Sequence, residues 1–158
     1  MSGSVMAIFV ASASGDRPAA QSAAQLDAGR GIVGDRYYDQ DPDAQITLVD
    51  ADTIDAVNAA TGWSLRPEET RRNVVTRGVD LNQWEHGRLR VGDAILEGVE
   101  LCEPCAVLGG LLANDSRQPA DVVKALLHKA GLRARIVEGA EIRPGDRVED
   151  ASAAATAS

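Results

Sequence analysis

A chain of 158 residues is long enough for one globular domain, and 44% hydrophobic with 25% charged residues is typical of a folded domain in water. The formal net charge of −8 argues against a protein that binds nucleic acid or an anionic membrane through a broad basic face. Two cysteines are too few for a secreted disulfide framework, and no apolar run is long enough to span a membrane. Residues 1–10 lack the pattern of a signal peptide. We therefore expect a cytoplasmic protein.

The first half of the chain alternates short apolar runs with glycine-rich and acidic loops. Asp50 is a suitable N-cap for a helix over residues 51–60, which Gly62 would end. Residues 17–28 are rich in Ala and Gln without a clear period, and we predict a loop there. Short runs with β-branched residues predict strands at 5–10, 45–49 and 73–76.

The second half places another helix between strands. Pro119 suits the first turn of a helix over residues 119–129, which Gly131 would end. The apolar face expected for it consists of Val123, Leu126, Leu127 and Ala130. Strands are predicted at 88–91, 94–101 and 132–138, with a last short strand after the turn Pro144-Gly145-Asp146.

Many short strands at close spacing with two inserted helices favour an α+β, β-rich fold. We expect a closed or nearly closed β-barrel with peripheral helices, because strands and helices do not alternate as they would in a doubly wound parallel sheet. Residues 1–149 should form a single domain. Residues 150–158 are Ala- and Ser-rich without an apolar anchor, and we predict a disordered tail.

Cys102 and Cys105 are the only cysteines of the chain and the side chains best suited to soft-metal or sulfur chemistry. Pro104 removes a backbone donor and fixes the turn before Cys105. A buried cysteine without such a role would be an inert small hydrophobe. A zinc site would need both histidines, which do not lie at motif spacing, and a thioredoxin-like site would need a helix start where Leu108-Gly109-Gly110 stands.

Two charged segments are candidates for anion binding. Arg71-Arg72-Asn73 precedes an expected buried strand, and arginine forks suit phosphate and other planar oxyanions while an asparagine amide suits the edge of a heterocycle. The alternative is a solvated loop in which these arginines pair with Glu68 and Glu69. Gly34-Asp35-Arg36-Tyr37 could contact an anion or a ring, or its Asp-Arg pair could only fix a turn.

Other motifs of known chemistry are missing from the sequence. Gly29-x-Gly31-x-x-Gly34 has the spelling of a dinucleotide-binding loop, but it neither follows a clear strand nor begins a helix, so we reject that interpretation. There is no Gly-x-Ser-x-Gly elbow, no P-loop and no His-Glu-x-x-His.

Six segments follow one another in a specific order. They are Gly29-x-Gly31-Ile32-x-Gly34-Asp35-Arg36-Tyr37, Gln45-Ile46-Thr47-Leu48, Arg71-Arg72-Asn73-Val74-Val75-Thr76-x-Gly78-Val79-Asp80-Leu81, Val91-Gly92-Asp93-Ala94-x-Leu96-Glu97-Gly98, Cys102-x-Pro104-Cys105 and Pro144-Gly145-Asp146. Together they resemble a MOSC domain, the module named after the C-terminal part of molybdenum-cofactor sulfurases. The resemblance is to the small stand-alone bacterial members and covers about residues 5–149.

The resemblance implies a β-barrel-rich α+β fold and a set of site residues. Cys105 takes the place of the family cysteine that ligates molybdenum or carries sulfur, and Cys102 is its less essential neighbour. The residues that match the cofactor-contacting positions of the family are Arg71 and Asn73, Asp35 and Arg36, and, mainly through their backbone, Glu103 and Pro104.

The resemblance also implies a function. We expect binding of the molybdenum cofactor (molybdopterin), or of a sulfur species destined for it, in redox or sulfur-transfer chemistry with a redox or sulfur-donor protein partner. Relatives that reduce N-hydroxylated compounds have an additional N-terminal β-barrel domain, and the sulfurases have a cysteine-desulfurase domain; we expect neither here. One alternative is a non-catalytic cofactor carrier or binding module. Another is a fold that has lost its site, with Cys105 buried and unreactive.

Overall fold

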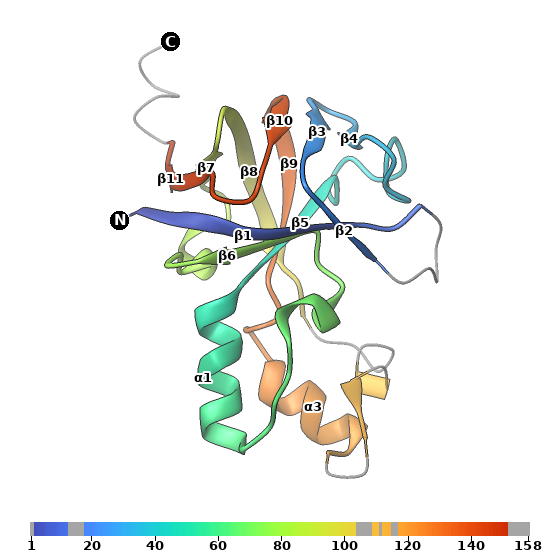
Figure 1. Ribbon diagram of the computed structural model, residues 1–158, viewed down its shortest axis with the longest axis vertical. Helices are drawn as coiled ribbons and strands as arrows, with labels where there is room; N and C mark the ends of the chain where they lie inside the picture. Colours follow the sequence, from blue (N-terminus) through green and yellow to red (C-terminus); the bar gives the residue numbers. More distant parts are fainter. Residues whose placement is uncertain (1, 13–17, 104–108, 111, 115–116, 152–158) are drawn as a thin grey trace.

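The computed structural model describes residues 2–12, 18–103, 109–110, 112–114 and 117–151. Its main strands are β1 (Ser2–Val10), β5 (Ile46–Asp50), β6 (Val74–Arg77), β7 (Arg88–Val91), β8 (Ala94–Leu101), β9 (Leu132–Glu138) and β11 (Arg147–Asp150). Across the described residues these seven strands close a barrel in the order β11-β7-β8-β9-β5-β6-β1, because β1 pairs with β11 as well as with β6 (Figure 1). The pairing of β5 with β6 is parallel, whereas the other neighbours in the barrel are antiparallel.

Aliphatic side chains at alternating strand positions fill the barrel. In β9, Leu132, Ala134 and Ile136 are at most 2% exposed, while the intervening arginines face outward. Further members of this cluster include Ile8, Leu26, Ile46, Leu48, Val91 and Ile142. A barrel interior filled by aliphatic side chains leaves little room for a polar ligand, so we expect a binding site at its outer surface.

A second, smaller sheet covers part of the barrel and corrects one prediction. β3 (Ala24–Asp27) pairs with β10 (Ala140–Ile142) and with β4 (Gly31–Ile32), and β2 (Ala19–Gln21) extends the large sheet beside β1. The loop expected over residues 17–28 is therefore wrong. The cause is that β3 has only two inward positions, Ala24 and Leu26, and its partner β10 is more than 100 residues away in the sequence.

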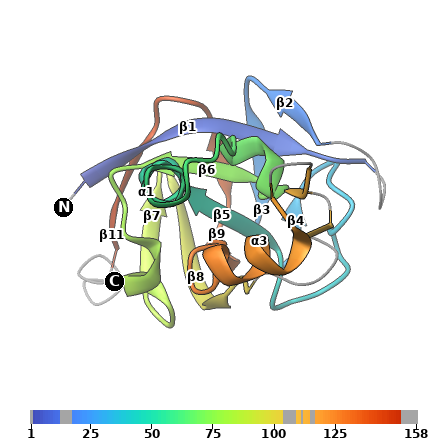
Figure 2. The same cartoon turned by 90° about the horizontal axis from the view of Figure 1, so that it is seen from below.

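Both helices lie outside the barrel, as expected, on the same side of it (Figures 1 and 2). They are α1 (Ala51–Thr61) and α3 (Pro119–Leu126). Asp50 caps α1 by accepting a hydrogen bond from the backbone N–H of Asp52 at 3.0 Å, and Gly62 ends it with φ of 78°. A second apolar cluster joins the helices to the barrel through Val49, Ile54, Val57, Val75, Val122 and Leu126, among others.

The second helix is shorter than predicted and presents a different face. It ends at Leu126, its buried residues are Val122 and Leu126, and Leu127 is 49% exposed. Tertiary hydrogen bonds explain the early end: the N–H of His128 donates to Glu103 at 2.9 Å, and its carbonyl accepts from Asn82 at 2.8 Å. These bonds hold the backbone after α3 in a non-helical conformation.

The remaining fold predictions agree with the structure or fall outside it. The strands predicted at 88–91, 94–101 and 132–138 have those bounds. The β-rich α+β fold with a closed barrel is confirmed. Most of the predicted tail, 152–158, lies outside the described residues, while Asp150 ends β11 and Ala151 is buried. No helix in the described part of the chain is both long and apolar enough to cross a membrane.

A substitution at Gly98 would test how closely the barrel wall packs against its neighbouring segment. A short 3-10 helix, η2 (Leu81–Trp84), lies against β8 where Gly98 stands, and a methyl group on Gly98 would clash with the carbonyl oxygen of Trp84. We therefore expect Gly98→Ala to lower the free energy of unfolding by roughly 1–3 kcal/mol, because the backbone of η2 would have to move. Urea unfolding measures this change.

Gly110→Ala is the matched control for this substitution. A methyl group on Gly110 meets no atom of the described residues within 4 Å, so we expect a change within about 0.5 kcal/mol. Equal stability of the two variants would contradict the close contact between η2 and β8.

Candidate functional site

A cavity of about 680 Å³ lies beside the end of β8, where the cysteine segment begins. Its size is within the range of small-molecule sites, roughly 300–1,000 Å³. Side chains of opposite charge line it, and they are Arg36, Arg71, Arg72, Arg133, Asp41, Glu100 and Glu103. Tyr37, Thr47 and Cys102 complete the part of the wall that bears on function.

The strand order explains why residues distant in sequence meet here. β8, β9, β5 and β6 are consecutive neighbours in the barrel, so Glu100 on β8, Arg133 on β9 and Thr47 on β5 lie side by side. Arg71 and Arg72 precede β6, after a 3-10 helix η1 (Pro67–Thr70). Arg71 ends that helix with φ of 65°, an uncommon conformation for a residue other than glycine.

The arginines of the cavity are held in different ways. Arg72 donates from Nε to the carbonyl of Ala130 at 2.8 Å, and Arg133 pairs with Glu100. The Nε of Arg133 is nevertheless buried without a hydrogen-bond partner among the described residues. A buried donor without a partner is costly unless a ligand or water accepts from it.

Two further contacts shape the rim. The guanidinium of Arg36 lies over the ring of Tyr37, 4.7 Å from its centre. His128 contacts the carboxylate of Glu103 through Nδ1 at 2.9 Å, which fixes Glu103 at the edge next to Cys102. The rim thus includes the pair formed by Arg36 and Tyr37 and the carboxylate of Glu103 that His128 contacts.

Asn73 lies behind the cavity rather than on its wall. Its amide nitrogen donates to the carbonyl of Phe9 at 3.1 Å and to Asp35 at 3.4 Å. Its amide oxygen accepts from the N–H of Thr47 at 3.0 Å and from the hydroxyl of Thr47 at 3.1 Å. An asparagine amide has two donors and two acceptor sites, and all four are used within the protein.

Asp35 belongs to the same buried network. It is 7% exposed and accepts hydrogen bonds from the N–H of Ala11 at 3.2 Å and of Tyr37 at 3.3 Å, besides the bond from Asn73. The carboxylate therefore anchors the turn through backbone groups and does not pair with Arg36. This leaves Arg36 to stack on Tyr37.

The structure divides the predicted site residues into three groups. Arg36, Arg71 and Glu103 line the cavity, and Asp35 and Asn73 support it from behind. Pro104 and Cys105 lie outside the described residues. Arg66 contacts the carboxylates of Glu68 and Glu69 at 3.5 Å each, and these three residues line a separate cavity together with Arg71.

Arg133 and Glu100 were missed from the sequence. They occupy outward positions of β9 and β8, where charged side chains are ordinarily solvated, and Arg135 two residues later is such a case. Only the pairing of β8 with β9 and β5 shows that Arg133 faces a cavity.

Cys102 is 6% exposed at the cavity wall. Burial raises the pKa of its thiol, and the positive charge of nearby Arg72 opposes this only in part. Cys102 is consequently a protonated, weakly nucleophilic thiol at neutral pH.

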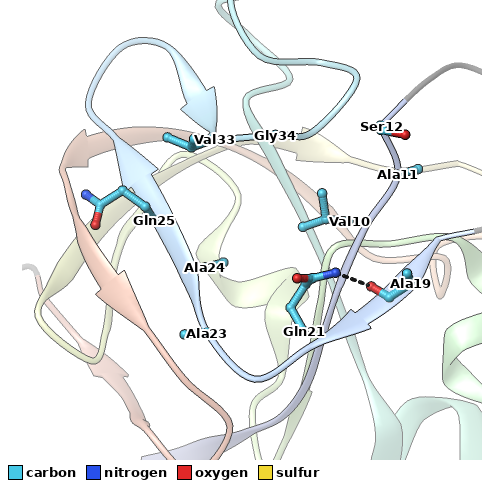
Figure 3. A pocket seen from close by; sticks show the side chains of 10 residues that line it. All are labelled: Val10, Ala11, Ser12, Ala19, Gln21, Ala23, Ala24, Gln25, Val33 and Gly34. Carbon is cyan, nitrogen blue, oxygen red and sulfur yellow. Dashed lines mark hydrogen bonds between the residues drawn. The ribbon is translucent and has the colours of Figure 1, made fainter.

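Figure 3 shows a second cavity, of about 560 Å³. It is lined by Val33 and Gly34 and by residues of β1, β2 and β3. None of its described lining residues is charged. An anionic ligand is therefore suited to the arginine-lined cavity and not to this one.

The buried network makes a prediction about stability. Asn73→Ala removes the side-chain partner of the Thr47 N–H and of the Phe9 carbonyl, and one of the hydrogen bonds to Asp35, so we expect the free energy of unfolding to fall by roughly 2–3 kcal/mol. Chemical denaturation provides the measurement. The control is Asn82→Ala at an exposed asparagine, with an expected change of about 0.5 kcal/mol or less. A small effect at Asn73 would mean that water replaces its bonds.

Solved structures share this architecture. The YuaD protein from Bacillus subtilis superposes with a TM-score of 0.83 at 18% identity, over 94% of each chain. YiiM from Geobacillus stearothermophilus has a TM-score of 0.71 at 14% identity, over 92% of this chain and 73% of that one. For YiiM from Escherichia coli the TM-score is 0.69 at 15% identity, over 95% and 69%. At these identities the likeness shows a common fold.

No curated protein sequence matches the chain significantly. The family comparison does give a match: residues 35–149, well over half of the chain, fit the family model of the MOSC domain. That span begins at Asp35 and includes the arginine segment, the cysteine segment and the barrel strands from β5 onward. The chain belongs to the MOSC domain family.

Proposed function

We propose that this protein is a cytoplasmic MOSC protein that binds the molybdenum cofactor, or a sulfur species destined for it, in the arginine-lined cavity. Cys105 is proposed as the metal ligand or sulfur acceptor, and a redox or sulfur-donor protein as the partner. The observation that carries the proposal is a concentration of guanidinium groups, one with a buried and unpartnered N–H, beside the cysteine segment of a protein with net charge −8.

The donor set of the cavity fits a phosphate-bearing cofactor. Arginine forks match phosphate oxygens, and the buried Nε of Arg133 supplies a donor that no described residue satisfies. The four arginines of the cavity are partly buried, so each guanidinium attracts an oxyanion more strongly than it would in bulk water. The proposed role of Arg71 and Arg133 is to bind the anionic end of the cofactor, and that of Arg36 is to contact the cofactor beside Tyr37.

The cysteine segment supports a thiophilic metal at the same place. Cys102 and Glu103 are wall residues, and Cys105 follows three positions after Cys102 in the sequence. When bound, the cofactor supplies a redox-active metal with an affinity for thiolate sulfur. The protein binds and orients it: Arg72 is fixed by Ala130, and Glu103 by His128.

A non-catalytic cofactor carrier would use the same cavity. The two functions separate in one experiment on protein loaded in a cofactor-competent host. An enzyme reduces an N-hydroxylated compound with a supplied electron donor, or transfers sulfur, whereas a carrier binds the cofactor and does neither.

Removal of one cavity charge tests the binding site. We expect Arg71→Gln to reduce the affinity for a pterin monophosphate roughly 10- to 100-fold, because a charge-assisted hydrogen bond in a partly buried site is lost. Titration followed by pterin fluorescence, together with metal analysis of the loaded protein, measures this. Arg143→Gln, at an exposed arginine paired with Glu141, should leave the affinity unchanged. If the unaltered protein holds neither pterin nor molybdenum, the proposal fails.

The two cysteines should respond in opposite ways. Cys105→Ser should abolish molybdenum or persulfide loading while leaving the thermal midpoint nearly unchanged. Cys102→Ser should keep loading but cost roughly 1–3 kcal/mol of stability, because a buried hydroxyl replaces a buried thiol. Metal content and thermal unfolding are measured on both variants. If the Cys105→Ser variant is still loaded and the Cys102→Ser variant is not, Cys102 and not Cys105 is the metal ligand or sulfur acceptor.

A further inference from the structure

An exposed tyrosine stands in the wall of the arginine-lined cavity. Only 3% of the residues are aromatic, and Tyr37 is 41% exposed. The guanidinium of Arg36 lies over the ring of Tyr37, 4.7 Å from the centre of that ring. A guanidinium over the face of a phenol ring is a cation–π pair, and both groups can also stack against a planar ring.

The backbone around Tyr37 is fixed by hydrogen bonds. The N–H of Arg36 donates to Ala11 at 2.7 Å, that of Tyr37 to Asp35 at 3.3 Å, and that of Gln40 to the carbonyl of Tyr37 at 3.1 Å. Among the described residues the hydroxyl of Tyr37 makes no hydrogen bond. The fold therefore positions this side chain without depending on its ring or its hydroxyl.

The next residue shows what a structural tyrosine looks like in the same loop. Tyr38 donates its hydroxyl to Asp27 at 2.5 Å, and Arg30 lies 5.0 Å from its ring centre. Arg30 in turn pairs with Asp39 at 2.5 Å. Each polar group of this set has a protein partner, and Tyr38 does not line the cavity. The pair formed by Arg36 and Tyr37 differs from the pair formed by Arg30 and Tyr38 because both of its residues line the arginine-lined cavity.

We propose that Tyr37, with Arg36 stacked on it, is a specificity-determining platform that selects ligands in which a flat heteroaromatic ring is attached to an oxyanion. The inference rests on the proposed binding of a cofactor in this cavity and adds the residue that recognises its ring. Arg71 and Arg133 bind the anionic end, and stacking on the platform distinguishes a ring-bearing anion from an inorganic one.

Three variants and three probes test the platform. The probes are a pterin monophosphate, adenosine monophosphate and inorganic molybdate, each titrated against the full chain. We expect Tyr37→Leu to weaken pterin monophosphate binding roughly 5- to 100-fold, as for loss of one stacked aromatic, and to leave molybdate binding unchanged. Tyr37→Phe should retain affinity within about twofold, because the ring and not the hydroxyl makes the contact. Tyr38→Leu is the control and should also retain it.

The outcomes separate this inference from the proposed function. If pterin monophosphate binds equally well to Tyr37→Leu and to the unaltered protein, or if Tyr37→Phe is as damaging as Tyr37→Leu, the platform is wrong while the anion site stands. If adenosine monophosphate binds more tightly than the pterin and depends on Tyr37, the platform is right and the cofactor assignment is wrong. If no probe binds the unaltered protein, both are wrong.

Discussion

The hydrogen bonds of Asn73 join the parts of the molecule on which the cavity depends. Through its side chain and backbone, Asn73 connects β1 at Phe9, β5 at Thr47 and the turn at Asp35. Each of these bonds is buried or part-buried, where an unpaired polar group is costly. The network therefore specifies one arrangement of the three segments. The arginines that adjoin them in sequence, Arg36 and Arg72, are placed at the cavity as a consequence.

The clustered arginines are possible because the protein compensates them individually. Arg133 has Glu100, and Arg72 has the carbonyl of Ala130. Like charges in a partly buried wall repel one another, and an incoming oxyanion relieves that repulsion in addition to its own attraction. Four arginines against three carboxylates make the charged wall net positive in a protein of net charge −8, and this contrast favours an anion in the cavity.

The sequence predicted the fold where local chemistry decides it. The strands at 88–91, 94–101 and 132–138 are bounded by turn residues and rich in aliphatic side chains, and they were predicted to the residue. β3 and β10 were missed because each has only three or four residues and gains its stability from a partner remote in sequence. The end of α3 was missed for a related reason: Glu103 and Asn82, which hold His128, are also remote in sequence.

The site shows the same division between local and tertiary information. The sequence segments around Arg36 and Arg71 were enough to predict both as residues of the site. For Asn73 the sequence was not enough, because the role of a side-chain amide depends on which groups its two donors and two acceptor positions contact. Asn73, expected to touch the cofactor, has each position of its amide taken by the protein, so its side chain supports the cavity from behind.

The segment of residues 34–37 illustrates how one short sequence can serve both fold and ligand. Asp35 points into the buried network, whereas Arg36 and Tyr37 face the cavity. Replacement of Asp35 would unpair backbone donors and affect stability, while Tyr37 has a side chain that the fold leaves unbonded. Stability and selectivity are thus assigned to adjacent residues. Ring recognition can change in this loop without cost to the barrel, because the bonds that hold the loop are made by its backbone and by Asp35.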